Sequence, residues 1–186
     1  MITVFGLGNP GSKYDNTRHN AGYDALCRVA AFFHIELKKR CFRKYRIATL
    51  DNARLVFPLT YMNNSGKVIK HFNIDKPSDL VVICDNMDLA VGGLRIRLGG
   101  GSSGQKGLDS IAAALGSSDF VRIYVGIGRP KEGVSVVDHV LGREDEPEKV
   151  RAYNEALNLA SQAVCKYISG SSIEEIQCEF NRKGIL

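Results

Sequence analysis

Apolar positions along the chain alternate between continuous runs and stretches with helical spacing. Continuous runs over residues 2–7 and 80–84 are typical of strands buried on both faces of a sheet. Between them, Ala21, Ala25, Val29 and Phe32 recur at helical spacing, which predicts a helix that begins near Thr17, a possible N-cap. Strands that alternate with helices are typical of α/β folds.

The rest of the chain continues this alternation. Residues 43–50 and 53–57 predict a hairpin, 94–98 a half-exposed strand, and 120–127 another strand; helices are predicted around 68–72 and over 108–115, 147–168 and 173–181. The pattern Ser171-x-x-Glu174 predicts a capping box at the start of the last helix. No repeat or linker interrupts the chain. We therefore expect a single domain over residues 1–186, with a mixed, mostly parallel twisted sheet flanked by helices and a helical C-terminal quarter.

Composition excludes several classes of protein. The 186 residues are 44% apolar and 24% charged, which excludes a disordered chain. The net charge of +5 permits a phosphate-bearing partner without requiring one. Five cysteines without a C-x-x-C pair argue against a disulfide framework or a common zinc site. The N-terminus lacks the features of a secretory signal and the apolar runs are too short to span a membrane, so we expect a cytoplasmic protein.

The glycine-rich segment after the first strand matches a dinucleotide-binding pattern only formally. Residues 6–11 read Gly-Leu-Gly-Asn-Pro-Gly, which fits G-x-G-x-x-G. However, Pro10 removes one backbone donor, the helix begins several residues later, and no acidic residue ends a second strand at the required distance. A nicotinamide-dependent oxidoreductase is therefore a weak alternative, whereas Asn9 lies where open α/β sheets place their ligands.

Five polar residues are the candidates for chemistry. Asn9 and Asp85 each follow a predicted strand, and His19 lies in the first turn of a predicted helix. A carboxylate at a strand end can orient an imidazole for general-base work, and Asp88 is a second candidate for that carboxylate. Asn63 either caps the helix that follows it or polarises a substrate carbonyl.

Together these motifs resemble bacterial-type peptidyl-tRNA hydrolases. The resemblance rests on the ordered set of segments 6–11, Tyr14, 17–22, 61–66, Asp85-x-x-Asp88-Leu89 and the glycine-rich run ending at Gly107-Leu108. The motifs extend from residue 1 to about residue 142 in the order of the family, and the total length fits. Each motif is weak by itself, but the ordered set is specific.

The resemblance implies hydrolysis of the ester that joins a peptide to the 3′ ribose of tRNA, without a metal or cofactor. His19 matches the histidine that activates water, Asp85 the aspartate that orients it, and Asn9 and Asn63 the asparagines that bind the histidine and the substrate. Tyr14 and Tyr61 match positions that contact substrate, although the family more often has Phe at the latter. The implied partner is peptidyl-tRNA at its acceptor end and 3′ CCA, and we expect a monomer that does not bind membranes.

This sequence departs from the family pattern at several substrate contacts. Lys106 stands where the family usually has Asn, and Gln105 before it where His is common. Tyr124 occupies a position that is often basic and grips the terminal phosphate. Arg97 keeps the basic character of its own position in the family, and we expect Arg122, on the face of Tyr124, to replace the charge missing at Tyr124.

Three other interpretations concern features outside this set. Cys84 is a poor nucleophile for His19, because strand alternation places it on the face opposite Asp85. Residues 38–46 contain six basic side chains with interleaved aromatics, which fit either a nucleic-acid contact or, somewhat better, a lysine-protected edge strand. A non-catalytic RNA-binding relative, like the plastid splicing-factor paralogues of the family, is the alternative of a different class; the retained Asn9, His19, Asn63 and Asp85 argue against it.

Overall fold

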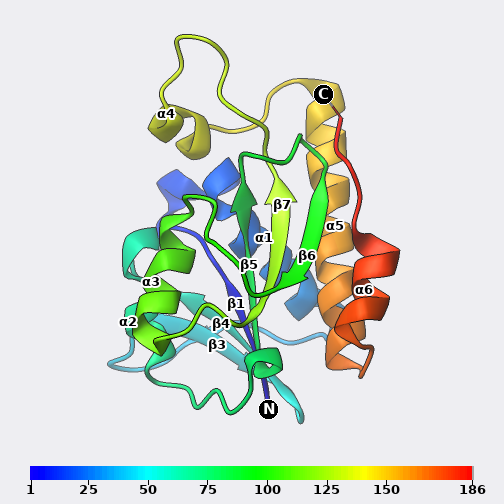
Figure 1. Cartoon of the computed structure of the whole chain (residues 1–186). Coiled ribbons are helices and arrows are strands. Elements are labelled where there is room, and N and C mark those ends of the chain that lie inside the picture. The colour runs from blue at the N-terminus through cyan, green and yellow to red at the C-terminus, as the bar shows by residue number, and fades with distance from the viewer. Residues whose placement is uncertain (186) are drawn as a thin grey trace.

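The protein is built on a seven-stranded mixed sheet, seen in a computed structural model that describes residues 1–185 (Figure 1). Its strand order is β2-β3-β4-β1-β5-β7-β6. The strands are β1 (Ile2–Gly6), β2 (Lys38–Lys39), β3 (Tyr45–Thr49), β4 (Ala53–Pro58), β5 (Leu80–Asn86), β6 (Leu94–Leu98) and β7 (Val121–Gly126). The central strands β4, β1, β5 and β7 are parallel, while β3 and β6 run antiparallel to their neighbours. The predicted α/β class, with a mixed and mostly parallel sheet, is confirmed.

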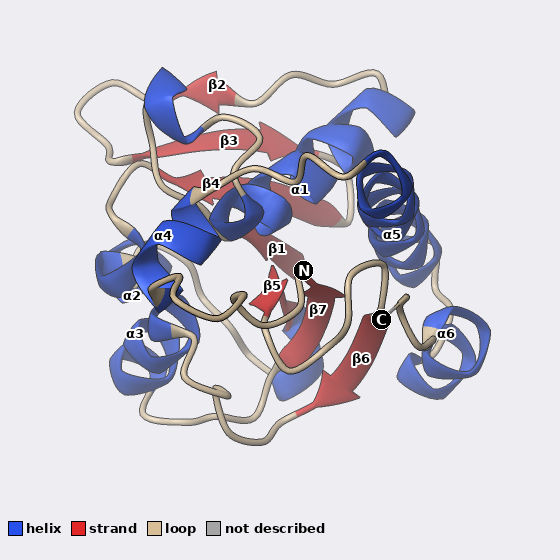
Figure 2. Ribbon diagram, turned by 90° about the horizontal axis from the view of Figure 1, so that it is seen from above, coloured by secondary structure: helices blue, strands red, loops and turns tan. Residues whose placement is uncertain are grey.

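Helices cover both faces of this sheet (Figure 2). The helices are α1 (Ala21–Phe32), α2 (Gly66–Ile69), α3 (Lys106–Leu115), α4 (Val136–Leu141), α5 (Pro147–Ile168) and α6 (Ile173–Phe180). The helices α1, α5 and α6 pack on one face, and α2 and α3 pack on the other. The short α4 lies above the carboxyl ends of β5 and β7, where an open α/β sheet places its ligands (Figure 1).

The central strands are buried on both faces, which explains their continuous apolar runs. In β5, Val81 and Ile83 join the core beneath α1 and α5, whereas Val82 and Cys84 join the core beneath α2 and α3. Successive side chains of a strand point to opposite faces, so both sets must be apolar. The same alternation turns Cys84 away from Asp85, as the sequence predicted.

Several predicted element boundaries are wrong by a few residues. The helix expected near Thr17 begins at Ala21, after a separate 3₁₀ turn over Arg18–Asn20. Helix α3 begins at Lys106 rather than at residue 108. The capping box of α6 is formed by Ser172 and Glu175 instead of the predicted pair one residue earlier. The edge strand proposed within residues 38–46 is only the two-residue β2, and helix α4 was not predicted, because an element of six residues carries too little periodicity.

Two glycines bring α1 unusually close to the sheet. A Cβ atom on Gly22 would overlap the carbonyl oxygen of Ile83 on β5, and one on Gly6 would lie 2.5 Å from the carbonyl oxygen of Gly22. The absence of both side chains lets the start of α1 rest on the ends of β1 and β5. This contact places the residues just before α1 beside the carboxyl end of β5.

None of the helices within residues 1–185 has both the length and the apolar character needed to cross a membrane. The five cysteines are all free thiols, and two of them, Cys84 and Cys165, are buried.

Candidate active site

A cavity of about 240 Å³ opens at the carboxyl ends of the central strands. The end of β5, the turn after β1, the glycine-rich segment before α3, and α4 surround it. Its lining residues are Asn9, His19, Asp85, Asn86, Met87, Ser103, Gly104, Gln105, Lys106, Val136, Val137, Val140 and Leu141. Three of the four residues that the resemblance assigns to catalysis therefore share one cavity.

His19 and Asp85 form a hydrogen-bonded pair in this cavity. The distance from His19 Nδ1 to Asp85 Oδ2 is 3.0 Å, and the side chains are 16% and 4% exposed. Because an ionised carboxylate only accepts hydrogen bonds, Nδ1 carries the proton that Asp85 receives. The lone pair of a neutral imidazole then lies on Nε2. This nitrogen is available as a base.

Gln105 supports the other oxygen of the same carboxylate. Its Nε2 donates to Asp85 Oδ1 at 2.9 Å, and its Oε1 accepts hydrogen bonds from the backbone N–H groups of Gly107 and Leu108. The side chain is thus the N-cap of α3 and a donor to Asp85 at once. With Gln105 only 7% exposed, the carboxylate is held from both sides.

Asn9 is fixed by three hydrogen bonds that leave its amide donors free. Its backbone N–H donates to Asn20 Oδ1 at 2.8 Å, and its carbonyl oxygen accepts from Asn20 Nδ2 at 3.1 Å. Its own Oδ1 accepts from the backbone N–H of Met62 at 2.9 Å. The two N–H groups on Asn9 Nδ2 therefore remain as donors for a molecule in the cavity.

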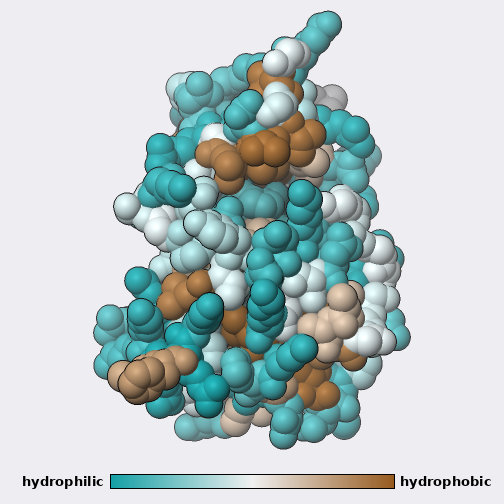
Figure 3. All heavy atoms as spheres, turned by 90° about the vertical axis from the view of Figure 1, so that its left-hand side faces the viewer, coloured by the Kyte–Doolittle hydropathy of each residue, from teal (hydrophilic) through white to brown (hydrophobic). Residues whose placement is uncertain are grey.

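Helix α4 forms an apolar wall over the polar side chains of Asn9, His19 and Asp85. Val136 and Val137 are 50% and 60% exposed, and Figure 3 shows apolar side chains gathered at the top of this face, over α4. The helix is joined to the turn that carries His19, because Arg18 pairs with Glu144 at 3.2 Å and donates to the carbonyl oxygen of His139. The exposed Lys106 lies opposite, at the first turn of α3.

The tyrosines and Asn63 lie beside the cavity rather than in it. The rings of Tyr14 and Tyr61 meet edge to face with centroids 6.4 Å apart, and Tyr61 is exposed. Asn63 is exposed on the 3₁₀ turn Met62–Asn64, where its Oδ1 accepts a hydrogen bond from Asn64. The structure thus places these side chains on the rim, and it does not bring Asn63 into contact with His19.

Arg122 does not occupy the position that we expected for a phosphate contact. It is on the face of Tyr124, as predicted, but only 1% exposed, and its guanidinium donates to the carbonyl oxygens of Gly101 and Ser118. Tyr124 is buried as well, and its hydroxyl donates to Gly101 at 3.2 Å. Both residues hold the glycine-rich segment from beneath, whereas Arg97 on β6 is exposed. The expectation for Arg122 is therefore corrected.

Other acidic residues lie outside the cavity. Asp88, the alternative partner for His19, is exposed and pairs with Arg129. In the described part of the chain, the one cluster of potential metal ligands is Glu144, Asp145 and Glu146, none of which lines the cavity. Asp85 is thus the carboxylate that meets His19.

Sequence reasoning missed the roles of Gln105, Asn20 and α4. Gln105 was singled out only as a departure from the family pattern, because glutamine is not a favoured N-cap residue. Asn20 lies eleven residues from Asn9, and nothing in the local pattern links the two. The available signal for an apolar wall was the set of apolar residues Val136, Val137, Val140 and Leu141 close together in the chain.

Comparisons with known proteins agree with this geometry. Residues 3–185 match the family described as peptidyl-tRNA hydrolase. The chain is 43% identical over 170 residues to a peptidyl-tRNA hydrolase of Halalkalibacterium halodurans, covering 88% of this chain and 91% of that protein. It is 38% identical to the enzyme of Bacillus subtilis, covering 98% and 100%.

A solved structure shares the fold over the whole length. The crystal structure of peptidyl-tRNA hydrolase from Acinetobacter baumannii superposes with a TM-score of 0.87 at 30% identity, covering 99% of this chain and 96% of that one. The resemblance drawn from the ordered motifs is confirmed by these matches. On the family match over residues 3–185 and the identity to these enzymes, the chain belongs to the peptidyl-tRNA hydrolase family.

Proposed function

We propose that this protein hydrolyses the ester between the peptide and the 3′ ribose of peptidyl-tRNA, with His19 as the general base, and so recycles tRNA from prematurely released peptidyl-tRNA. The observation that carries the proposal is the 3.0 Å hydrogen bond from His19 Nδ1 to Asp85 Oδ2 inside a cavity that Asn9 also lines. Such an arrangement fixes the tautomer that leaves Nε2 free to accept a proton.

In this mechanism Nε2 of His19 removes a proton from a water molecule as its oxygen adds to the ester carbonyl carbon. Asp85 stabilises the imidazolium that forms. When the tetrahedral intermediate collapses, the bond to the ribose 3′ oxygen breaks and that oxygen takes the proton from His19. The products are a peptide carboxylic acid, which ionises in solution, and a tRNA with a free 3′ hydroxyl.

One side chain, that of Asn9, is proposed to stabilise the developing oxyanion. The free amide donors of Asn9 are held in place by the bond from Met62 to its Oδ1. Fixed donors are more effective than mobile ones, because they need no reorganisation when the charge appears. The ammonium of Lys106, at the cavity edge, is proposed instead to donate to a carbonyl or phosphate of the bound substrate; it cannot accept a hydrogen bond from water as an asparagine would.

The outer contacts are proposed from their positions on the rim. Tyr14, Tyr61 and Asn63 lie next to Asn9 on the turns that follow β1 and β4, where a substrate chain leaving the cavity would meet them. The exposed Arg97 on β6 is retained as a contact for tRNA phosphate. Arg122 is not proposed as such a contact, because its side chain is buried.

We also propose that the protein is a cytoplasmic monomer that needs no cofactor. A tRNA substrate and five free thiols support a reducing cytoplasm. A cavity formed within one chain supports a monomer. A general base held by a carboxylate accounts for water activation by side chains alone, which supports hydrolysis without added metal.

The test compares N-blocked aminoacyl-tRNA with free aminoacyl-tRNA and follows ester cleavage with and without a chelator. Cleavage of the blocked substrate alone, unchanged by the chelator, is expected. His19→Ala is expected to lower kcat by roughly 10²–10⁴-fold, the usual contribution of a general base. His34→Asn is the control, because His34 is exposed at a positive φ of 53°, a conformation that asparagine tolerates.

Two results contradict the proposal. Normal turnover by a folded His19→Ala protein would remove the histidine from the mechanism. Binding of tRNA without any cleavage by the native protein would instead favour the non-catalytic RNA-binding alternative.

A further inference from the structure

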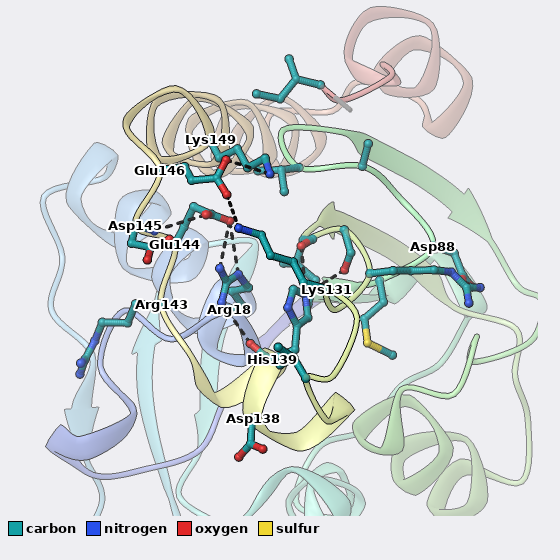
Figure 4. A pocket seen from close by; sticks show the side chains of 18 residues that line it. Arg18, Asp88, Lys131, Asp138, His139, Arg143, Glu144, Asp145, Glu146 and Lys149 are labelled. Atoms are coloured by element: carbon teal, nitrogen blue, oxygen red, sulfur yellow. Dashed lines mark hydrogen bonds and ion pairs between the residues drawn. The ribbon is translucent and has the colours of Figure 1, made fainter.

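A larger hollow next to the catalytic cavity is neutralised by its own side chains. It measures about 550 Å³ and contains cations and carboxylates in similar number (Figure 4). Arg18 pairs with Glu144, Lys131 and Lys149 both pair with Glu146, and Arg129 pairs with Asp88. Because each of these charges already has a partner, the hollow offers little net attraction to a charged ligand.

A second groove, of about 480 Å³, has the opposite character. We call it the basic groove. Its lining residues are Pro10, Lys39, Arg43, Lys44, Leu59, Thr60, Tyr61, Asn64 and Lys67. Strand β2, the turn after it and α2 contribute its four cations, and no carboxylate in the described part of the chain lines it. None of the four forms an ion pair within residues 1–185. Four unpaired cations around one groove favour a polyanion.

The predicted edge strand explains only part of this charge. Lys38 and Lys39 form β2 at the edge of the sheet, where lysines oppose pairing with another chain. Arg43 and Lys44 lie beyond the strand, and Lys67 comes from α2 on a different part of the chain (Figure 1). Protection of an edge does not require cations from a second element.

An exposed aromatic ring stands beside these cations. Phe42 is fully exposed and has a positive φ of 58° in a turn closed by the hydrogen bond from Arg43 N to Arg40 O. A bulky residue in this conformation is an outlier with a strained backbone. Exposed aromatic rings next to a basic groove are typical of proteins that bind single-stranded nucleic acid, in which bases stack on the rings.

The basic groove and the catalytic cavity share a wall. Asn9 lines the cavity and Pro10 lines the groove, while Tyr61 lines the groove and Met62 N donates to Asn9 Oδ1. A strand whose terminal ester lies at His19 therefore reaches the groove by passing over these two turns. The Tyr14 and Tyr61 rings stand at this boundary.

We infer that the basic groove binds the unpaired 3′ strand of the tRNA substrate, with its phosphates on Arg43, Lys44 and Lys67 and a base stacked on Phe42. The inference rests on the proposed function, since it takes the ester-bearing strand as the occupant. A polynucleotide fits better than a peptide, because its charges repeat with every residue and its bases suit an exposed ring.

The test measures binding of deacylated tRNA and of a short single-stranded RNA that ends in CCA, both without turnover. The triple variant Arg43→Gln, Lys44→Gln, Lys67→Gln is expected to weaken both by about 10–100-fold. The triple variant is also expected to reduce the slope of log K against log salt concentration by about 2. Each of the three lost phosphate contacts accounts for about 0.7 of that slope on a single strand. The matched control is Arg129→Gln, Lys131→Gln, Lys149→Gln, which removes three paired cations and is expected to change affinity by less than about threefold.

The aromatic contact has its own pair of variants. Phe42→Asn keeps a residue that tolerates positive φ and removes the ring, and it is expected to weaken the short RNA by about tenfold. Phe32→Ala removes another exposed ring, at the end of α1, and is expected to have no effect.

Three outcomes overturn the inference. Native affinity of the folded triple variant for both RNAs removes the groove from RNA binding. Weaker binding of tRNA with unchanged binding of the short RNA places the contact on the tRNA body instead. A KM that rises only with acidic peptides assigns the groove to the peptide. Because deacylated tRNA is not cleaved, the two binding results are independent of whether His19 acts as the base.

Discussion

Replacing Gln105 with glutamate separates its two roles, because the new side chain keeps one and reverses the other. In the native protein Oε1 caps α3 and Nε2 donates to Asp85 at 2.9 Å. A carboxylate still accepts the two backbone N–H groups, and the helix N-terminus favours its charge. It has no proton for Asp85 unless it is itself protonated. We therefore expect Gln105→Glu to keep helix α3 and to disturb the catalytic carboxylate.

The magnitude follows from the proton that the variant must hold. A glutamate with an ordinary pKa of about 4.3 costs roughly 4 kcal/mol to protonate at pH 7, at 1.36 kcal/mol per pH unit. The neighbouring Asp85 raises the pKa of the introduced carboxyl in the folded state. The resulting loss of stability is absent below about pH 4 and grows as the pH rises towards the folded-state pKa. At pH 7 we expect a loss of up to about 4 kcal/mol.

The loss of the hydrogen bond from Gln105 Nε2 to Asp85 Oδ1 is also expected to lower kcat. A hydrogen bond to a charged group contributes about 1.5–3 kcal/mol, so its loss lowers kcat at pH 7 by roughly 10–100-fold if it holds Asp85 in the productive orientation. KM is expected to change by less than about threefold, because Gln105 is not placed to bind the substrate chain. The ratio of variant to native kcat should rise towards one as the pH falls and the introduced carboxyl regains its proton.

The assay is the pH dependence of kcat and KM on N-blocked aminoacyl-tRNA, together with urea unfolding at the same pH values. Ser172→Ala is the matched control, since it removes the cap of α6 far from the cavity and is expected to cost about 1 kcal/mol without changing kcat. A ratio of kcat values that stays near one at every pH would refute the reasoning and reduce Gln105 to a helix cap.

Three further perturbations have expected outcomes. Burial raises the pKa of Asp24 to about 6, so stability is lost as the pH rises from about 4 to 6; Asp24→Asn is expected to stabilise the protein by roughly 1–3 kcal/mol at pH 7 and little at pH 4 in urea unfolding. An equal gain at both pH values would contradict this. Lys106→Asn is expected to raise KM or weaken its salt dependence while kcat stays within a few fold, and a large fall in kcat alone would make Lys106 a participant in the transition state. Gly22→Ala places a methyl group against the carbonyl of Ile83 and is expected to cost 3 kcal/mol or more; a melting temperature close to that of the native protein would show that α1 can shift.

The sequence predicted the elements whose pattern is long or one-sided. The 22-residue helix α5 was predicted with its correct bounds, because an amphipathic pattern of that length fits the helical period and not the strand period. The central strands appeared as apolar runs because burial on both faces leaves no polar positions. The start of α1 shifted by four residues and the capping pair of α6 by one, since caps depend on which side chain the folded backbone brings to the free N–H groups.

The candidate site was predicted in part from local pattern and in part from resemblance. Asn9 and Asp85 stand at the ends of strands that the pattern itself revealed, and parallel strands end at one edge of the sheet. Their meeting with His19 follows from the close seat of α1, which the glycines at positions 6 and 22 allow. The local pattern left Asp88 as an alternative partner for His19, the resemblance assigned Asp85, and in the structure it is Asp85 that His19 contacts.

Tertiary structure alone decided which polar residues face ligand and which serve the fold. Arg122 and Arg97 lie on the same sheet with the same charge, yet one is buried under the glycine-rich segment and the other is exposed. The two roles of Gln105 also depend on α3 and β5, which lie twenty residues apart in the chain. A sequence determines the local periodicity that makes strands and helices, because each side chain acts on its own backbone. It does not display the distances between elements, because these depend on how all the side chains of the two cores pack together.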